Sequence, residues 1–169
     1  MNIVTSFAPI ANPSAQVLIL GSMPGIASLT ANQYYAHPRN SFWRIMADIY
    51  GFNFDGDYST RVAHLLESGV AVWDVLSSCE RAGSLDSAIV NGSRVVNDFP
   101  SFFKQHFQIK LILFNGTEAE KSFNKNVLNQ LDLKHLSFMR LPSSSPTHTL
   151  ALPLKIAAWK KALSPYKLT

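Results

Sequence analysis

Two neighbouring segments near the N-terminus hold the residue types that could carry out chemistry. The first is the turn Gly21-Ser22-Met23-Pro24-Gly25, which follows an apolar run at 17–20. Because glycine has no Cβ, such a turn lets a ligand approach the backbone closely. The second runs from Gln33 to Trp43 and reads QYYAHPRNSFW, which is too rich in aromatic, amide and imidazole groups for a plain connector. Functional residues gather in loops at strand ends, so we interpret these segments as the wall of an active site.

Polar segments also follow three further apolar runs, at 70–73, 111–114 and, more weakly, 136–141. We interpret 74–86, 115–117 and 142–149 as the loops that leave these strands. The last loop places three serines between Pro142 and Pro146. Serine hydroxyl and amide groups suit the phosphates of a nucleic-acid backbone.

Apolar residues at helical spacing predict helices between these strands. The range 41–50 has apolar residues three and four positions apart, and Asn40 stands where an N-cap is expected. Further helices are predicted over 98–106, 117–131 and about 153–163. Apolar strands separated by helices predict a parallel sheet that is covered on both faces. Ligands of such sheets bind at the carboxyl ends of the strands, where the four polar segments lie.

Length and composition predict one domain over residues 1–169, with 47% hydrophobic residues to fill a core. The single cysteine, Cys79, excludes an intramolecular disulfide and a multi-cysteine metal site, and it fits a reducing compartment. The first residues lack the basic region of a signal peptide, and no apolar run approaches the ~20 residues that span a bilayer. We therefore expect a soluble, cytoplasmic protein.

The charge balance suits a polyanionic partner. Lys and Arg outnumber Asp and Glu by 15 to 11, which gives a net charge of +4 and a pI near 9.3. No polybasic tail is present, so a nucleic-acid surface would have to be folded. The candidates for phosphate contacts are Arg39, Arg81, Lys155, Lys160 and Lys161, although a solvated helix face explains the lysines equally well.

Five segments, taken together and in order, resemble the uracil-DNA glycosylase superfamily, and most closely its hypoxanthine-DNA (deoxyinosine) glycosylase branch. They are GSMPG from Gly21, QYYAHPRNSFW from Gln33, WDVL through GSLDSAI from Trp73, FNG from Phe114 and LPSSSP from Leu141. The resemblance covers nearly the whole chain. It implies a three-layer α/β/α sandwich around a four-stranded parallel sheet.

The same resemblance implies hydrolysis of the N-glycosidic bond of deaminated bases in base excision repair. Hypoxanthine is the first expected base, followed by uracil or xanthine. The reaction builds positive charge on the sugar and negative charge on the base, and it requires neither a metal nor another cofactor. The expected partner is damaged DNA, met by a monomer that has no membrane association.

The resemblance also assigns residues. Relatives that act on mismatched uracil and thymine carry Asn at the position of Met23, whereas the hypoxanthine branch uses the Asn of its His-Pro-Arg-Asn segment, here Asn40. Asn40 is therefore expected to orient the attacking water, and Tyr35 to stack the flipped base. The expected base pocket comprises Gly21, Ser22, Met23, Pro24, Gly25, Tyr35, His37, Asp74 and Asn115. The expected DNA contacts are Arg39, Ser143, Ser144, Ser145 and Pro146.

Two other functions stay open. A non-catalytic member that binds a lesion or a nucleobase is consistent with Met23, since a thioether cannot position water as an amide does. A hydrolase built on Ser144 and His148 is the second, although the Gly-x-Ser-x-Gly elbow is absent. Cys79 has no flanking base in the sequence, which favours a bystander thiol over a nucleophile.

Individual residues keep structural alternatives as well. Asn40 is either a catalytic residue or only a helix cap. His37 either contacts the ligand or fixes its own loop. Asp74 and Asn115 either read the Watson–Crick edge of a bound base or cap turns at the strand ends.

Overall fold

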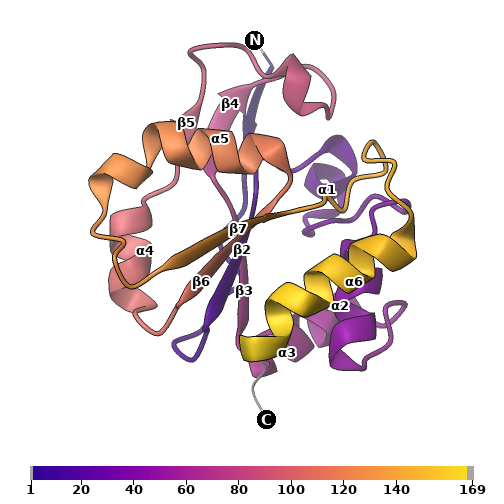
Figure 1. Ribbon diagram of the computed structural model, residues 1–169. Helices are drawn as coiled ribbons and strands as arrows, with labels where there is room; N and C mark the ends of the chain where they lie inside the picture. The colour runs from indigo at the N-terminus through magenta and orange to yellow at the C-terminus, as the bar shows by residue number, and fades with distance from the viewer. Residues whose placement is uncertain (1, 167–169) are drawn as a thin grey trace.

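A four-stranded parallel sheet forms the centre of the molecule, of which the computed structural model describes residues 2–166 (Figure 1). Its strands pair in the order β3-β2-β6-β7, and all three pairings are parallel. This sheet confirms the four predicted strands. Their bounds are β2 (Val17–Gly21), β3 (Val70–Asp74), β6 (Leu111–Asn115) and β7 (Ser137–Leu141).

Helices cover both faces of this sheet, which confirms the three-layer α/β/α arrangement. One face carries α4 (Phe99–Gln105) and α5 (Thr117–Asn126). The other face carries α2 (Phe42–Tyr50), α3 (Tyr58–Glu67) and α6 (Leu152–Leu163) (Figure 1).

The apolar run of β2 serves both layers, because successive side chains of a strand point to opposite faces. Leu18 and Leu20 belong to the core beneath α4 and α5, whereas Val17 and Ile19 belong to the core beneath α2, α3 and α6. All four side chains are at most 1% exposed. Burial on both faces explains why the central strands are continuous apolar runs.

A second, antiparallel sheet was not predicted. It pairs β1 (Ile3–Thr5), β4 (Leu76–Glu80) and β5 (Val95–Val96) in the order β1-β4-β5. The interpretation of 74–86 as a simple loop is therefore wrong, since β4 begins two residues after β3 ends. Strand β4 is mostly polar, and β1 and β5 have only three and two residues. None of them therefore gives an apolar run that periodicity could detect.

Several helix bounds also differ from those expected. The six-residue α1 (Ile26–Ala31) and α3 were not predicted, and α1 buries only Ser28. The N-cap of α2 is Ser41 rather than Asn40. Helix α5 ends at Asn126, before the short 3₁₀ turn η2 (Leu128–Gln130). Within residues 2–166 no helix has the length and apolar character needed to cross a membrane.

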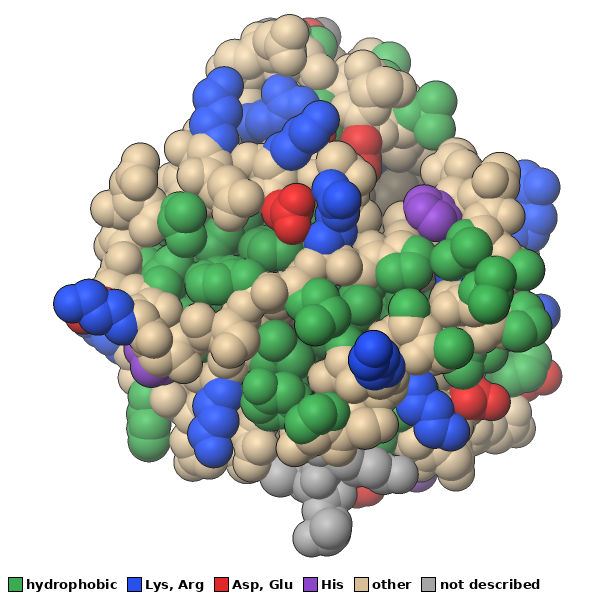
Figure 2. All heavy atoms as spheres, in the orientation of Figure 1, with side chains coloured by type: hydrophobic (Ala, Val, Ile, Leu, Met, Phe, Trp, Pro, Cys, Tyr) green, Lys and Arg blue, Asp and Glu red, His purple; other side chains and the backbone are tan. Residues whose placement is uncertain are grey.

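Strand β7 lies at one edge of the central sheet and carries exposed apolar side chains. Phe138 is 38% and Met139 47% exposed. Figure 2 shows apolar side chains gathered over this part of the molecular surface, where β7 runs in Figure 1. The opposite edge strand, β3, is buried along its full length.

Candidate active site

One cavity of about 360 Å³ lies at the carboxyl ends of the parallel strands. It is lined by the ends of β2, β3 and β6, by the segment between β2 and α2, and by the loop after β7. Every residue that the family resemblance assigned to the base pocket, to catalysis or to DNA contact lines this single cavity, whereas Arg81, Lys155, Lys160 and Lys161 do not. The assigned residues that line it are Gly21, Ser22, Met23, Pro24, Gly25, Tyr35, His37, Arg39, Asn40, Asp74, Asn115, Ser143, Ser144, Ser145 and Pro146.

Gly21 forms a tightly packed part of the cavity wall. A Cβ at this position would lie 2.6 Å from Asp74 Oδ1 and 3.0 Å from the Tyr35 hydroxyl oxygen. Any larger residue would displace both side chains. The glycine is therefore required by close packing at the strand end.

Tyr35 is held in a strained backbone conformation, with a φ of 55°. Left-handed geometry is uncommon for residues other than glycine and persists only where the surroundings enforce it. On one side of Tyr35, the Tyr34 N–H donates to the Tyr58 hydroxyl at 3.0 Å. On the other side, the Ala36 N–H donates to Ser28 Oγ at 3.1 Å. The ring stacks on Phe42 with centroids 4.1 Å apart and 24° between the planes. These contacts fix the ring at the cavity wall.

Asn40 stands at the start of α2 and serves its first turn. Its Oδ1 accepts the Phe42 N–H at 3.0 Å, and its own N–H donates to His37 O at 2.9 Å. The next amide, that of Ser41, donates to Ser144 O at 2.9 Å. An amide oxygen has two lone pairs, so Oδ1 can accept a second hydrogen from a molecule in the cavity. The side chain therefore combines a capping contact with access to the cavity.

The loop after β7 is built around Ser144, which is 0% exposed. Its N–H donates to Asn115 Oδ1 at 2.8 Å, and Asn115 Nδ2 donates back to Ser144 Oγ at 2.9 Å. The Asn115 amide thus fastens the loop to the end of β6. Ser144 lies inside the loop, so its hydroxyl is not presented to a phosphate as the sequence suggested.

Two basic residues expected to meet phosphates are buried instead. Lys155 is 3% exposed, and its Nζ donates to the carbonyls of Ser145 (3.2 Å) and His148 (2.8 Å), so α6 holds the loop after β7. Burial lowers the pKa of Lys155. Arg81 is 1% exposed and donates to the Pro24 carbonyl, which holds the turn after β2 in place. Both side chains position the cavity walls, and neither is free to bind DNA.

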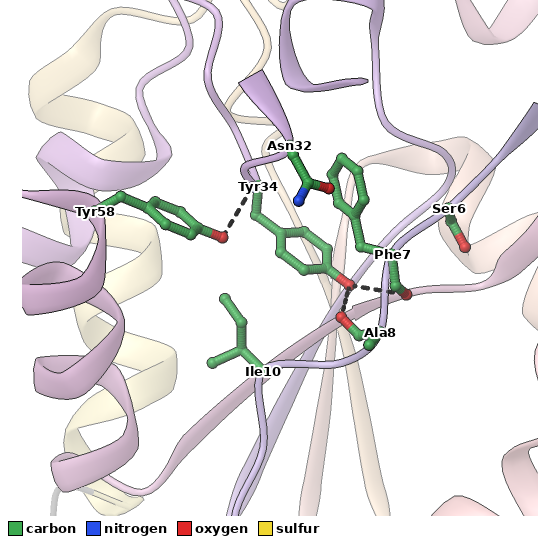
Figure 3. Close-up of a pocket in the computed structure, with 7 residues that line it drawn as sticks. All are labelled: Ser6, Phe7, Ala8, Ile10, Asn32, Tyr34 and Tyr58. Atoms are coloured by element: carbon green, nitrogen blue, oxygen red, sulfur yellow. Dashed lines mark hydrogen bonds between the residues drawn. The ribbon is translucent and has the colours of Figure 1, made fainter. Parts of the chain in front are cut away.

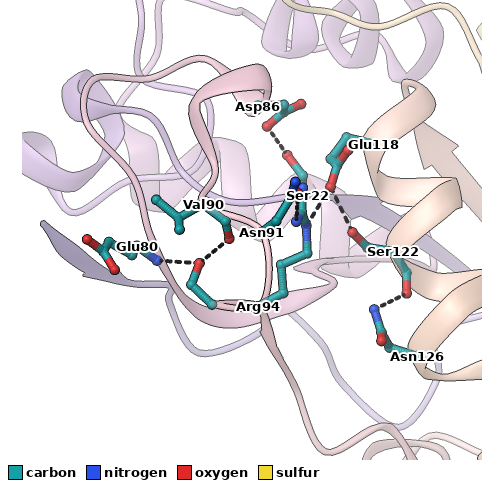
Figure 4. Close-up of polar contacts among 10 residues, drawn as sticks. Ser22, Glu80, Asp86, Val90, Asn91, Arg94, Glu118, Ser122 and Asn126 are labelled. Atoms are coloured by element: carbon teal, nitrogen blue, oxygen red, sulfur yellow. Dashed lines mark hydrogen bonds and ion pairs between the residues drawn. The ribbon is translucent and has the colours of Figure 1, made fainter.

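The end of the predicted segment 74–86 supplies one side of the cavity, although the strand β4 inside that segment was not predicted. Ser84, Leu85 and Asp86 follow β4 and line the cavity. Ser84 Oγ accepts the Ile26 N–H at 2.8 Å. Ser22 Oγ donates to Asp86 Oδ1 at 2.6 Å, as Figure 4 shows. The GSLDSAI segment is one of those that resemble the family, but its place beside the cavity depends on β4.

A neighbouring ion pair joins the small sheet to α5. Arg94 Nε lies 3.0 Å from Glu118 Oε1, and Ser122 Oγ donates to the same oxygen at 3.0 Å (Figure 4). The pair lies near the segment that carries Asp86. It helps to hold that side of the cavity against the main body of the fold.

Asp74 is the most perturbed carboxyl group of the cavity. Burial raises its pKa to about 7, and the nearby Asp86 charge adds to this while Arg81 opposes it. Burial also raises the pKa of Asp86. Cys79 is 2% exposed, and burial raises the pKa of its thiol, which argues against a nucleophile. Within residues 2–166 no group of three or more His, Cys, Asp or Glu side chains is arranged to hold a metal ion.

The two histidines of interest lie at the surface. His37 Nδ1 accepts the Arg39 N–H at 3.1 Å, which fixes the loop. The other ring nitrogen, Nε2, can still bond to a ligand. His148 is exposed and its backbone carbonyl holds Lys155. Ser144 pairs with Asn115 rather than with a histidine. The arrangement therefore lacks the nucleophile–base pair that a Ser-His hydrolase requires.

A second cavity, of about 430 Å³, lies beside Tyr34 and is lined by residues near the N-terminus, such as Phe7 and Ala8. Figure 3 shows that the Tyr34 hydroxyl donates to the Ala8 carbonyl at 2.9 Å and that the Tyr58 hydroxyl accepts the Tyr34 N–H. These polar groups hold the chain together. The first cavity, which brings the expected site residues together, is the better candidate for chemistry.

Comparison with known proteins agrees with this geometry. The family model of the uracil DNA glycosylase superfamily matches residues 8–164. A hypoxanthine DNA glycosylase of Methanosarcina barkeri (strain Fusaro / DSM 804) is 34% identical over 114 residues, which are 67% of this chain and 71% of the relative. The corresponding protein of Methanosarcina acetivorans is 35% identical over the same shares.

A solved structure shows the same fold over nearly the whole chain. It is the solution structure of a Methanosarcina acetivorans protein described provisionally as a uracil DNA glycosylase. The TM-score is 0.81 at 28% sequence identity, with 97% of this chain and 98% of the other covered. The fold and the cavity at the strand ends thus define a class of DNA glycosylases. The chain belongs to the uracil DNA glycosylase superfamily.

Proposed function

We propose that this protein removes deaminated bases from DNA, hypoxanthine first, by hydrolysing the N-glycosidic bond. One observation carries the proposal: Asn40, Tyr35 and the turn after β2 come together at one cavity. The curated relatives, named hypoxanthine DNA glycosylases, support hypoxanthine as the first base. The product would be an abasic site, which is an intermediate of base excision repair.

In this proposal Asn40 orients the water that attacks the sugar. Its Oδ1 accepts a hydrogen from the water while it keeps the Phe42 N–H as its second partner. The fixed position of Asn40 at the start of α2 supplies the pre-organisation that such a group needs. Met23 has no amide that could hold this water, so we assign the role to Asn40.

The base enters the cavity after it is flipped out of the helix. Tyr35 offers a rigid aromatic wall because Phe42 supports its ring. The volume of about 360 Å³ lies within the usual range of small-molecule pockets and accommodates a bicyclic purine. Uracil and xanthine are the further substrates that we propose.

Arg39 and the exposed parts of the loop after β7 would bind the DNA backbone. Arg39 is exposed at the cavity, and Ser143, Ser145 and Pro146 accompany it. None of the residues that line the cavity is a lysine, and Lys155 is held by two carbonyls. This supports a monofunctional enzyme, because a lyase step needs an amine that forms a Schiff base. We propose that the protein acts as a monomer without a cofactor.

The test is a panel of labelled duplexes, each with one hypoxanthine, uracil, xanthine or oxanine. After incubation with the protein, hot alkali cleaves the strand wherever a base has been released. After alkali treatment we expect more cleavage at hypoxanthine than at any other lesion. Before alkali treatment we expect no cleavage at any lesion. Strand cleavage without alkali would contradict the monofunctional assignment.

The same panel distinguishes the non-catalytic alternative. A protein that only binds lesions would shift the damaged duplex in a gel and leave it resistant to alkali. Intact duplexes in every lane, with folded protein and a clear gel shift, would overturn the proposed hydrolysis.

A further inference from the structure

Asp74 lies at the cavity wall with one carboxyl oxygen unpaired. The residue is 4% exposed, and Oδ2 has no hydrogen-bond partner within the described residues. The Tyr35 hydroxyl is a second buried polar atom without a partner there. Both groups lie against the same face of Gly21. Buried polar groups are nearly always hydrogen bonded, so this pair points to a ligand that supplies the missing partners.

Burial and the neighbouring Asp86 disfavour the ionised form of Asp74. Asp86 lies on the small-sheet side of the cavity and repels a second negative charge. Tyr34 and Tyr35 face Asp74 from the segment before α2; burial and the Asp74 charge raise the pKa of both phenols, so they stay neutral. Arg81 is the opposing positive charge, but it donates to backbone carbonyls and forms no ion pair with Asp74 within the described residues. Burial of an unpaired carboxylate is costly. Burial above all, and the Asp86 charge after it, raise the pKa of Asp74 to about 7, against the opposing charge of Arg81.

We propose that Asp74 holds the flipped base as a neutral carboxylic acid, whose O–H donates to the exocyclic carbonyl of the base and whose C=O accepts from the neighbouring ring N–H. The inference rests on the proposed glycosylase function and adds the protonation state of the active enzyme. Hypoxanthine presents this acceptor–donor edge at O6 and N1, and uracil presents it at O4 and N3. An ionised carboxylate would accept from the N–H but would repel the carbonyl.

The neutral form also suits the departure of the base. When the glycosidic bond breaks, its electron pair moves onto the base, and part of the negative charge reaches the exocyclic oxygen. A donor at that oxygen stabilises the departing base, whereas a carboxylate beside it would oppose the reaction. The proton remains shared in the hydrogen bond, so no co-reactant is needed. A neutral carboxyl could also pair with adenine in the reverse order, so the proposal concerns base departure rather than the rejection of adenine.

The test is the pH dependence of base release under single-turnover conditions with saturating protein. The substrate is a hypoxanthine duplex, and pH 6 and pH 8 are compared. For a carboxyl that titrates near pH 7, the wild-type rate should fall about tenfold between these values, following the fraction of neutral acid. The Asp74→Asn variant carries a permanent donor and acceptor of similar shape. It should lose this pH dependence and exceed the wild-type rate at pH 8, whereas Asp74→Ala should be slow at both values.

Two controls make the result specific. Because His37 is another titratable side chain of the cavity, His37→Gln is measured in parallel and should keep the tenfold fall. Titration of the carboxyl signals by NMR in the free protein gives a readout that is independent of activity. The signal assigned to Asp74 should move with a midpoint near pH 7 and be missing in Asp74→Asn.

The outcomes separate this inference from the proposed function. If wild-type protein releases hypoxanthine but its rate rises from pH 6 to pH 8 and Asp74→Asn is inactive, the ionised carboxylate is the active form and the inference is wrong while the function stands. If the rate is flat and Asp74→Asn behaves as wild type, Asp74 does not act on the base. If no lesion is cleaved at either pH, the proposed function itself fails.

Discussion

At the scale of single residues, Asn40 combines a capping contact with a place at the cavity. Its Oδ1 accepts the Phe42 N–H, and its backbone is tied to His37. A helix cap is worth about 1 kcal/mol, which is far too little to explain a large change in rate. Measurements of stability and of activity on variants of Asn40 therefore distinguish the capping role from the catalytic role.

We expect Asn40→Ala to lower the rate of base release by about a hundredfold or more, since it removes a pre-organised group at the reaction centre. DNA affinity should change much less. Single-turnover kinetics on a hypoxanthine duplex measure the rate, and a thermal unfolding curve measures the lost cap. Asn40→Ser, which keeps a capping oxygen, should recover stability but not activity. Nearly full activity of the folded Ala variant would reduce Asn40 to a cap.

Met23 is the residue that most separates this chain from pyrimidine-directed relatives. It is 7% exposed and lines the cavity. We expect Met23→Asn to raise uracil release relative to hypoxanthine release, because an amide in this turn can hold water. The ratio of the two single-turnover rates is the measurement, with Met23→Leu as the apolar control. An unchanged ratio would show that the turn lies too far from the sugar.

Asp74 should make the stability of the protein depend on pH. Its carboxyl is neutral below about pH 4 in both states, and as the pH rises the unfolded chain ionises before the folded one, whose pKa is about 7. The wild type should therefore lose stability between about pH 4 and pH 7, by an amount on the order of a few kcal/mol. Asp74→Asn removes this loss. Denaturant unfolding at pH 5 and pH 8 should show the variant gaining on the wild type, and a constant difference would contradict the raised pKa.

At the scale of elements, the walls of the cavity are held by contacts between segments rather than within them. Asn115 at the end of β6 fastens the loop after β7 through Ser144, and Lys155 from α6 holds the same loop. Arg81 does the same for the turn after β2. Such buried polar contacts fix the loops in one arrangement at the site of catalysis.

Ser144→Ala should lower the free energy of unfolding by roughly 1–3 kcal/mol, because it removes the hydroxyl that accepts from Asn115 Nδ2 and leaves that donor without a partner. Ser145→Ala is the matched neighbour: its hydroxyl contacts only Thr147 in the exposed part of the loop, and the expected loss is about 0.5 kcal/mol or less. Urea unfolding compares the two. Equal losses would show that Ser144 does not anchor the loop.

At the scale of the whole molecule, a net charge of +4 is modest, so DNA affinity has to come from charge placed near the cavity. Arg39 is the exposed basic residue of the cavity lining. Arg140 is partly neutralised by Glu120, 3.4 Å away, and Lys155 is buried. The basic surface available to DNA is therefore smaller than the sequence suggested.

Binding should weaken steeply with salt, and Arg39→Gln should make the log–log slope shallower by about 0.9, the value for one phosphate contact on a duplex. Lys104→Gln on α4, away from the cavity lining, should leave the slope unchanged. Fluorescence anisotropy over a salt series gives both slopes. A flat response of the wild type would contradict DNA as the partner.

The sequence by itself determined the central sheet, because strands buried on both faces must be apolar runs and these runs are visible without any contact information. It also identified many of the residues that line the cavity. Parallel strands bring their carboxyl ends to one edge, so polar residues that follow each run, such as Gly21, Asp74 and Asn115, had to converge.

Only the tertiary structure decided what each of these residues can do. The Ser22–Asp86 contact spans 64 positions and the Asn115–Ser144 contact 29, and no local pattern predicts such pairings. The small sheet escaped detection because its short strands carry no apolar periodicity. The burial of Arg81, Lys155 and Ser144 turned expected DNA contacts into supports of the cavity walls. The isolation of the Asp74 carboxyl arises likewise from burial and from neighbours distant in sequence, since the charge of a side chain depends on what surrounds it in space.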